Sequence, residues 1–133
     1  MTEMTPIQVV QAGYEAILGR GDVDGFLEHF ADDAVLLEAD SLPYGGRYEG
    51  KAAIKAALLG LFPLYSSFSY KPDVLTENGP WVIAYGDFSI TSSKTGETIT
   101  FKLAEVSKVE NGKIVLIHPI YSDTKALLKT MGI

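Results

Sequence analysis

The chain of 133 residues is 47% hydrophobic and 21% charged, which is typical of one globular domain with a packed core and excludes a disordered chain. Its formal net charge of −6 disfavours contact with a phosphate backbone, so we expect no nucleic acid partner. It has no cysteine, no basic leader before an apolar stretch and no apolar run near the roughly 20 residues of a membrane helix, which excludes disulfides and thiolate chemistry and predicts a cytoplasmic protein outside the membrane.

Two helices are predicted at the start of the chain. A capping box of Thr5 and Gln8 begins the first, and apolar residues at spacings of three and four continue to the glycines at 19 and 21. Asp22 caps a second, shorter helix, whose apolar face extends to Phe30. We therefore expect a helical hairpin at the N-terminus.

The middle of the chain changes type twice. Branched and apolar residues from Ala34 to Ala39 predict a short strand, and the segment from Ser41 to Gly46 has the proline and glycine content of a loop. A third helix is predicted from Lys51 to Phe62, with an apolar face that includes Leu58, ending before a proline.

The second half of the chain is rich in strand-forming residues. Segments 68–75, 81–91, 97–109 and 113–121 are separated by glycine, asparagine and serine clusters, which predicts an antiparallel meander. Asp123 caps a final short helix that turns Leu127 and Met131 inward. Residues 1–133 are thus predicted to form a single α+β domain, in which helices cover the concave side of a curled sheet and leave a pocket between the two layers.

Three polar residues occupy positions where the pattern requires apolar ones. Glu105 belongs to the apolar face of segment 97–109. In one interpretation that face is partly exposed at the sheet edge, or Glu105 pairs with a surface lysine. In the other, Glu105 lines an apolar cavity, where burial raises its pKa and keeps it protonated as a hydrogen-bond donor. Glu38 is either a solvated strand end or a general base in the cavity. Tyr14, on the apolar face of the first helix, is a core tyrosine or a cavity donor.

The two histidines predict no metal site. His118 lies in a strand beside a proline, His29 ends the second helix, and neither has another histidine at ligand spacing. We expect no metal and no organic cofactor.

The turn at residues 110–113 decides which residues share a face. A two-residue Asn111-Gly112 turn pairs Glu110 with Lys113 and places Glu105 opposite His118, on one face. A three-residue loop with Gly112 at positive φ instead places Glu105 with Ile117 and Tyr121. Sequence chemistry permits both turns.

Several short motifs, in this order, resemble the ketosteroid isomerase and SnoaL-like branch of the nuclear transport factor 2-like (NTF2-like) superfamily. The resemblance covers nearly the whole chain and is strongest over residues 9–60. The motifs are Val9-Val10-Gln11, Tyr14, Gly21-Asp22-Val23-Asp24-Gly25, Phe30-Ala31-Asp32-Asp33-Ala34, Gly50, Ala52-Ala53-Ile54, Gly112-Lys113-Ile114, Tyr121-Ser122-Asp123 and Gly132.

The resemblance implies an NTF2-like cone with three N-terminal helices on a strongly curved, mostly antiparallel sheet, assembled as a homodimer through the outer sheet face. It also implies that Tyr14 and Glu105 stand where ketosteroid isomerases keep their oxyanion donors, and Glu38 where they keep the base. Both acids are aspartates in those enzymes, and Ala57 and Leu58 replace aromatic residues there. The three-residue loop is the turn that the resemblance favours.

The leading functional hypothesis is an isomerase or cyclase that abstracts a proton next to a carbonyl of an apolar small molecule. Glu38 would be the ionised base, while Tyr14 and a neutral Glu105 would stabilise the enolate, so the two carboxyls should titrate well apart. Alternatives are a non-catalytic ligand-binding or dimerisation domain, and a hydrolase or dehydratase for which Asp40 is the local second acid. Ligand contacts are expected from Asp40, Tyr44, Leu58, Phe62, Phe101, Ile117 and Tyr121.

Overall fold

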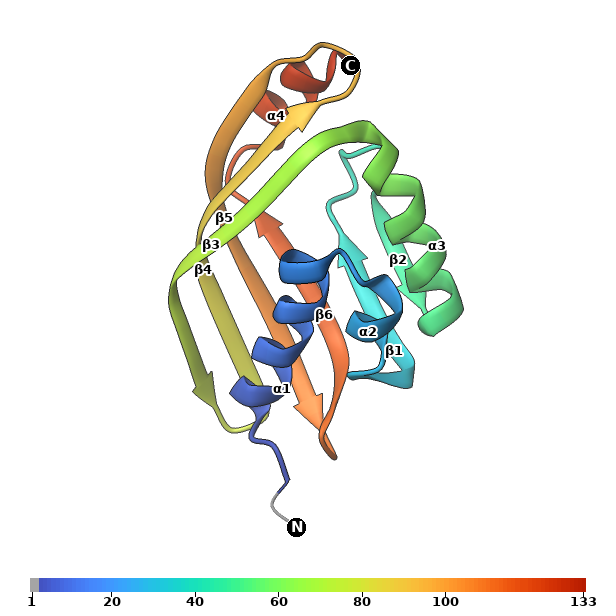
Figure 1. Ribbon diagram of the computed structural model, residues 1–133, viewed down its shortest axis with the longest axis vertical. Helices are drawn as coiled ribbons and strands as arrows, with labels where there is room; N and C mark the ends of the chain where they lie inside the picture. The colour runs from blue at the N-terminus through green and yellow to red at the C-terminus, as the bar shows by residue number, and fades with distance from the viewer. Residues whose placement is uncertain (1–2) are drawn as a thin grey trace.

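A six-stranded sheet curls around the N-terminal helices without closing (Figure 1). The computed structural model describes residues 3–133, and the strand order is β2-β1-β6-β5-β4-β3. Strands β1 and β6 are parallel, and every other neighbouring pair is antiparallel. The mixed α+β architecture predicted from the sequence is confirmed.

The helices begin where the sequence places their caps. Thr5 accepts from the backbone N–H of Gln8 and the Gln8 side chain answers in a capping box, while Asp22 and Asp123 each cap a helix through the third residue on. The helical elements are α1 (Pro6–Tyr14), a π-helical segment η1 (Glu15–Gly19), α2 (Val23–Leu27), α3 (Lys51–Leu61), a 3-10 turn η2 (Phe62–Leu64) and α4 (Thr124–Met131).

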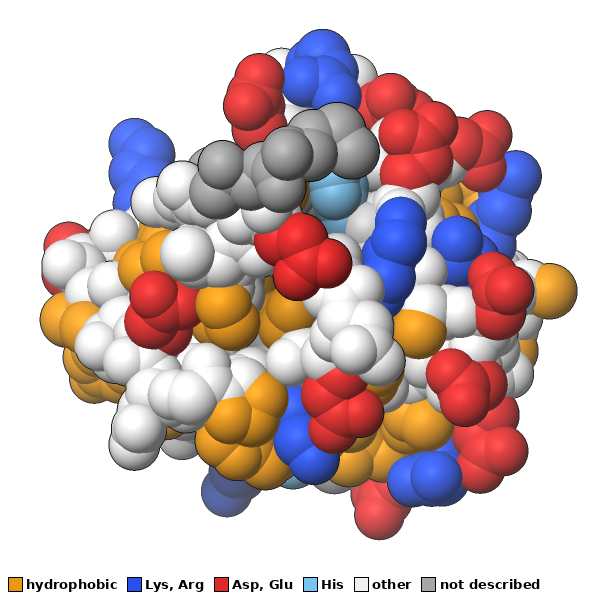
Figure 2. Space-filling model, turned by 90° about the horizontal axis from the view of Figure 1, so that it is seen from below, with side chains coloured by type: hydrophobic (Ala, Val, Ile, Leu, Met, Phe, Trp, Pro, Cys, Tyr) orange, Lys and Arg blue, Asp and Glu red, His pale blue; other side chains and the backbone are white. Residues whose placement is uncertain are grey.

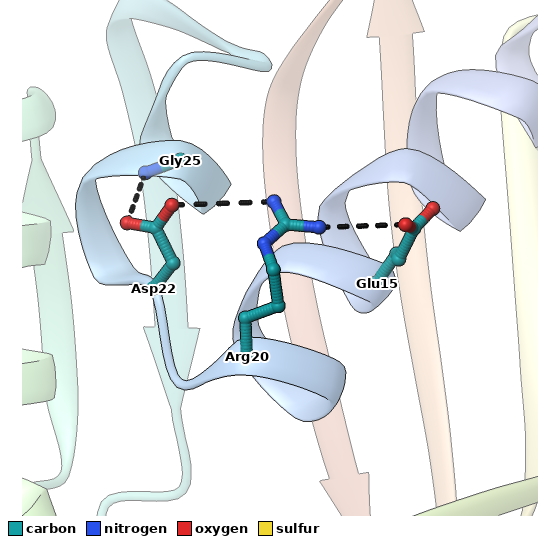
Figure 3. Close-up of polar contacts among 4 residues, drawn as sticks. All are labelled: Glu15, Arg20, Asp22 and Gly25. Carbon is teal, nitrogen blue, oxygen red and sulfur yellow. Dashed lines mark hydrogen bonds and ion pairs between the residues drawn. The ribbon is translucent and has the colours of Figure 1, made fainter.

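The corner between η1 and α2 is tied by one arginine (Figure 3). Arg20 lies 3.4 Å from Glu15 and 4.0 Å from Asp22, whose other carboxylate oxygen accepts from the backbone N–H of Gly25. These ion pairs are exposed and contribute at most about 1 kcal/mol. Their role is to orient the turn that directs α1 and α2 toward the sheet.

The observed strands differ from the predicted ones at three places. The chain at Phe30 is already strand, because it pairs with Ile114 of β6, so the second helix ends at Leu27 and not at Phe30. Strand β2 was not predicted, and β3 begins at Tyr65 and not at residue 68. The strands are β1 (Phe30–Glu38), β2 (Gly46–Glu49), β3 (Tyr65–Asn78), β4 (Trp81–Ser92), β5 (Thr98–Glu110) and β6 (Lys113–Tyr121).

The β5–β6 turn corrects one prediction and confirms its consequence. Asn111 and Gly112 both have positive φ, 52° and 74°, and Glu110 pairs with Lys113, so the turn has two residues and not three. Val109 then pairs with Ile114 but Lys108 pairs with Leu116, which leaves Val115 as a bulge.

That bulge shifts the register by one residue. Glu105 therefore pairs with Pro119 and shares a face with Tyr121, whereas His118 pairs with Val106 and points to the opposite face. The predicted arrangement of the two faces is confirmed, although the device that produces it is a bulge in β6 and not a longer loop.

Gly86 permits the sharp curl of the sheet. It lies on the inner face of β4, opposite a register shift between Pro72 and Val74 of β3. A Cβ at this position would overlap the carbonyl oxygen of Lys71 and the Cα of Pro72. Only glycine allows β3 to fold so closely over β4, and this close approach helps to shape the cone.

The buried core forms two clusters on either side of Tyr14. One contains Val9, Val10 and Phe30, and the other contains Tyr65, Tyr70 and Leu127; Tyr14 packs against both. On the outside, acidic and basic side chains are interspersed with hydrophobic ones over the end seen in Figure 2. Within residues 3–133, no helix has the length and hydrophobicity needed to cross a membrane.

We predict that Gly86→Ala lowers the free energy of unfolding by about 2–3 kcal/mol, because the added methyl group overlaps backbone atoms that cannot rotate away. Gly60→Ala is the matched control: Gly60 is an exposed residue of α3 with no atom near its missing Cβ, so alanine there should stabilise the protein by up to about 1 kcal/mol. Urea unfolding of both variants tests this. Equal effects of the two substitutions would contradict the role given to Gly86.

Candidate functional site

A cavity of about 110 Å³ lies between the helices and the concave face of the sheet. Its wall is apolar and strongly aromatic, and among residues 3–133 the ionisable side chains that line it, tyrosines aside, are those of Glu38 and Glu105. The lining residues are Tyr14, Ile17, Leu18, Phe26, Leu36, Glu38, Ile54, Leu58, Leu61, Phe62, Tyr65, Phe68, Tyr70, Phe88, Leu103, Glu105, Ile117, Pro119 and Tyr121.

Glu105 reaches the cavity from the middle of β5. Its strand neighbours are Ala84 and Pro119, whose small or rigid side chains leave room for the carboxyl group. Tyr14 is the last residue of α1, and its hydroxyl donates a hydrogen bond to Glu105 Oε1, with 2.7 Å between the two oxygens. The pair joins the first helix to the sheet across 91 residues of sequence.

Glu38 reaches the same cavity from the end of β1. It is 9% exposed and accepts a hydrogen bond from the Tyr121 hydroxyl at 3.0 Å. Behind Tyr121, the hydroxyl of Tyr44 lies 3.4 Å from that of Tyr121 and 2.5 Å from that of Tyr65. Each carboxyl of the cavity therefore has a phenol as its hydrogen-bond donor.

Burial raises the pKa of both carboxyls, because a charge is poorly solvated in an apolar cavity. The pKa of Glu105 rises to about 7, although the hydrogen bond from Tyr14 lowers it in part. The pKa of Glu38 rises to about 8, where burial and repulsion from Glu105 outweigh the hydrogen bond from Tyr121. Burial and the neighbouring carboxyl also raise the pKa of each donor phenol, Tyr14 and Tyr121, so both keep their protons near pH 7.

These values correct the predicted titration of the two acids. We expected Glu38 to stay ionised and Glu105 to be neutral, with well separated pKa values. Instead both values are raised and lie close together, because both carboxyls are buried in the apolar cavity and the charge of Glu105 repels that of Glu38. Repulsion between the two carboxyls disfavours ionisation of both at once near neutral pH.

Four of the residues expected to contact a ligand line the cavity: Leu58, Phe62, Ile117 and Tyr121. The other three, Asp40, Tyr44 and Phe101, lie outside this lining. Asp40 follows the end of β1 and is exposed to solvent, outside the lining. Tyr44 is buried behind Tyr121, and Phe101 packs between Phe88 and Tyr121 in the core.

Several lining residues were missed by the sequence analysis. Tyr65 fell in a segment assigned to neither helix nor strand, because Pro63 ends α3 just before β3 begins. Phe68 and Tyr70 alternate with polar residues along β3, and Phe88 does the same in β4, so strand periodicity could have identified all three as inward-facing. No single-residue signal marks Tyr65.

The histidines lie away from the cavity. His118 points to the outer face of the sheet, and His29 precedes β1. Within residues 3–133, no group of three histidine, aspartate or glutamate side chains is arranged to hold a metal ion.

A family model described as a SnoaL-like domain matches residues 10–117 of the chain. No curated protein sequence matches this chain. The family match and the structural likenesses together confirm the resemblance that was inferred from the sequence motifs.

Three solved structures illustrate the likeness in fold. An NTF2-like protein of unknown function from Burkholderia pseudomallei is 26% identical, with a TM-score of 0.90 over 98% of this chain and 100% of that one. TerC, co-crystallised with polyporic acid, is 23% identical, with a TM-score of 0.87 over 97% and 100% of the two chains. A protein described as a SnoaL-like polyketide cyclase from Jannaschia sp. CCS1 is 13% identical, with a TM-score of 0.84 over 97% and 92%.

The raised pKa values predict that stability falls as pH rises. A carboxyl whose pKa is higher in the folded than in the unfolded state contributes stability that is complete below about pH 4.3 and is lost as pH rises through its folded pKa, at about 7 for Glu105 and about 8 for Glu38. Each carboxyl should therefore lower the free energy of unfolding by up to about 1.4 kcal/mol per pH unit between pH 5 and its own pKa.

Urea unfolding at pH 5, 6, 7 and 8 measures this decline. Glu105→Gln should make the decline shallower, whereas Glu97→Gln, which removes an exposed glutamate between β4 and β5, should leave it unchanged. If the free energy of unfolding of the unmodified protein stays constant or rises over this pH range, the raised pKa values of the two buried acids would be contradicted.

Proposed function

The chain belongs to the SnoaL-like domain family, and we propose that it is an enzyme that transfers a proton next to the carbonyl group of an apolar small molecule. The reaction is an isomerisation or an aldol-type cyclisation through an enolate. The observation that carries the proposal is that two carboxyl groups, each with a phenol donor, face one apolar cavity.

The proposed mechanism divides one proton between two carboxyls. The carboxylate of Glu38 removes a proton from the carbon next to the substrate carbonyl, and the same group returns it to a second carbon. The negative charge that develops on the carbonyl oxygen is stabilised by hydrogen bonds from Tyr14 and protonated Glu105. All the protons in this scheme come from the substrate and from these side chains.

Substrate binding is what assigns the shared proton to Glu105. In the empty cavity burial raises the pKa of Glu38 to about 8 and that of Glu105 to about 7, so the empty cavity does not assign the proton to one of the two acids. A carbonyl oxygen beside Tyr14 and Glu105 accepts a hydrogen bond only from the protonated form of Glu105, so it raises the pKa of that group. Repulsion between the two carboxyls then leaves Glu38 as the ionised base.

The cavity wall favours a neutral, planar substrate. Phe62, Phe68 and Phe88 form a row of nearly parallel rings, with centroids 5.5 and 6.4 Å apart and interplanar angles of 12° and 14°. No lysine, arginine or histidine of the described part of the chain lines the cavity to receive an anionic group. TerC, which shares the fold, was co-crystallised with polyporic acid, and a neighbour described as a polyketide cyclase shares it as well.

We predict that the protein isomerises 3-cyclohexen-1-one, a one-ring β,γ-unsaturated ketone, to the conjugated enone. Because the base must be ionised and the donor protonated, the rate should follow a bell-shaped pH profile with limbs near pH 7 and 8. Ultraviolet absorbance measures the conjugated product, and NMR in D₂O measures deuterium incorporated at the γ carbon of that product, where the proton is returned.

Variants of the two acids separate their roles. Glu38→Gln removes the base and should slow the reaction about 10²–10⁴-fold. Glu105→Ala should slow it about 10²-fold, and Glu105→Gln less, because the amide keeps a donor. Glu49→Gln, at an exposed position in β2, is the control. Equal rates for the unmodified protein, Glu38→Gln and buffer would contradict catalysis and support the alternative of a non-catalytic ligand-binding domain.

We also propose that the protein forms a homodimer through the outer face of the sheet. Two cross-strand rows on this face are mainly apolar: Val74, Tyr85, Ala104 and Ile120 in one, and Thr76, Ile83, Val106 and His118 in the other. Val74, Ile83, Tyr85 and Ile120 are each between 42% and 48% exposed. Such a continuous apolar surface is typical of a face that is covered by a partner.

A charge placed within this face should separate the subunits. Ile83→Lys is expected to shift the mass measured by light scattering from that of a dimer to that of a monomer, because an unpaired lysine would be buried in the interface. Leu59→Lys is the control, since Leu59 is equally apolar and 51% exposed but lies on α3. A monomeric mass for the unmodified protein would contradict the proposal.

A further inference from the structure

Three tyrosine hydroxyls lie in a row that ends on Glu38. Tyr65 is the first residue of β3, Tyr121 is the last residue of β6, and Tyr44 lies in the loop between β1 and β2. The hydroxyl oxygens of Tyr65 and Tyr44 are 2.5 Å apart, those of Tyr44 and Tyr121 are 3.4 Å apart, and Tyr121 donates to Glu38 at 3.0 Å.

The directions of these hydrogen bonds depend on whether Glu38 is ionised. A carboxylate only accepts, so Tyr121 donates to it, Tyr44 donates to Tyr121, and Tyr65 donates to Tyr44. Every hydroxyl proton in the row then has an acceptor. Each donor also polarises the next, which strengthens the last hydrogen bond, to Glu38.

A neutral Glu38 that donates into the row reverses these directions. Its proton goes to Tyr121, Tyr121 donates to Tyr44 and Tyr44 donates to Tyr65, so the Tyr65 proton must find an acceptor in the cavity. Among the described residues, the hydroxyl of Tyr65 makes no hydrogen bond except the one to Tyr44. A neutral Glu38 with its proton on the other oxygen keeps the Tyr121 hydrogen bond, but a phenol donates more strongly to a carboxylate than to a neutral carboxyl group, so the row of phenols favours the ionised form of Glu38.

Glu105 lacks comparable support. Tyr14 is its one phenol donor, and the nearby hydroxyl of Tyr70 donates to the backbone carbonyl of Leu103 instead. The two cavity acids are thus held differently: Glu38 is at the end of a chain of three donors, and Glu105 is paired with one. This difference matches the roles of base and acid that the proposed function needs.

The middle of the chain is held rigidly. Tyr44 is 8% exposed and lies outside the cavity lining, so it does not contact a ligand there. Its ring packs edge-on against that of Tyr65 at 6.4 Å, and its backbone carbonyl accepts from the Tyr48 hydroxyl at 2.9 Å. An ordered phenol in this place acts on the cavity only through Tyr121.

We propose that the hydroxyls of Tyr65, Tyr44 and Tyr121 form a donor chain that stabilises the ionised form of Glu38 and orients it as the base, with Tyr44 and Tyr65 as positioning residues. The role of Glu38 as a base rests on the proposed function. The donor chain itself is a property of the protein without a ligand. The groups that face Glu38 are the three phenols of the chain and the carboxyl of Glu105, which repels it.

The test is a ¹³C-carboxyl NMR titration of Glu38 in Tyr121→Phe, Tyr44→Phe and Tyr65→Phe, with Tyr70→Phe as the matched control. Each substitution keeps the ring and removes one hydroxyl. Loss of a hydrogen bond to a carboxylate should raise the pKa of Glu38 by about 1 in Tyr121→Phe. The increase should be smaller in Tyr44→Phe, smallest in Tyr65→Phe, and absent in Tyr70→Phe.

Thermal unfolding of the same variants separates this role from a structural one. A structural tyrosine lowers the melting temperature without changing the titration of Glu38. An unchanged Glu38 titration in both Tyr121→Phe and Tyr44→Phe, or the same change in Tyr70→Phe, would overturn the donor chain.

Kinetics then link the chain to catalysis. In Tyr44→Phe the acid limb of the isomerisation profile should move to higher pH, with up to about a tenfold loss of rate at pH 6 and recovery near the optimum. A graded NMR titration without any isomerisation by the unmodified protein would keep the donor chain and refute the proposed function. An unmoved acid limb in Tyr44→Phe would refute a positioning role for Tyr44.

Discussion

Two carboxyl groups share one apolar cavity without a cation, and the site is organised around this constraint. An unpaired carboxylate is costly in such surroundings, so each acid either keeps its proton or takes hydrogen bonds from neutral donors. The protein uses both solutions. Phenols from α1 and β6 donate to the acids, and the pKa values of both acids rise toward neutrality. Burial in this cavity therefore brings the pKa values of two carboxyls close to neutral pH.

The fold meets the constraint through local departures from regular structure. The bulge at Val115 turns Glu105 and Tyr121 to the same face, and the close approach at Gly86 bends β3 over the cavity. The π-helical segment follows directly after Tyr14, at the point where α1 reaches Glu105. Each departure has a position beside the site, as expected where packing must serve a cavity as well as a core.

Sequence reasoning was sufficient for features that follow from periodicity or capping. The caps at Thr5, Asp22 and Asp123 mark where helices begin, and strand alternation was enough to identify Glu105 as an acid on an apolar face. It failed where one residue changes the outcome. A bulge such as Val115 has no composition signal, since any residue can be left unpaired when the strands on either side fix the register.

The remaining errors have the same origin. Strand β2 and the early start of β3 depend on partners distant in sequence, and so does the burial of Tyr44 behind Tyr121. The near-equal pKa values of Glu38 and Glu105 result from mutual repulsion and depth of burial, which no residue pattern records. The positions of the helices and of most strands were therefore predictable from the sequence. The interactions between side chains that lie far apart in the sequence were not.

In the proposed function, Tyr14 and Glu105 form a donor site for a developing oxyanion, with Glu38 as the base beside it. A crystal structure of the protein with 2-naphthol, a planar phenol that mimics an enolate, tests this most directly. The account predicts the phenol oxygen within hydrogen-bond distance of both the Tyr14 hydroxyl and the Glu105 carboxyl, with the ring between Glu38 and the phenylalanine row. A phenol oxygen directed to Glu38, or a ring bound outside the cavity, would contradict it.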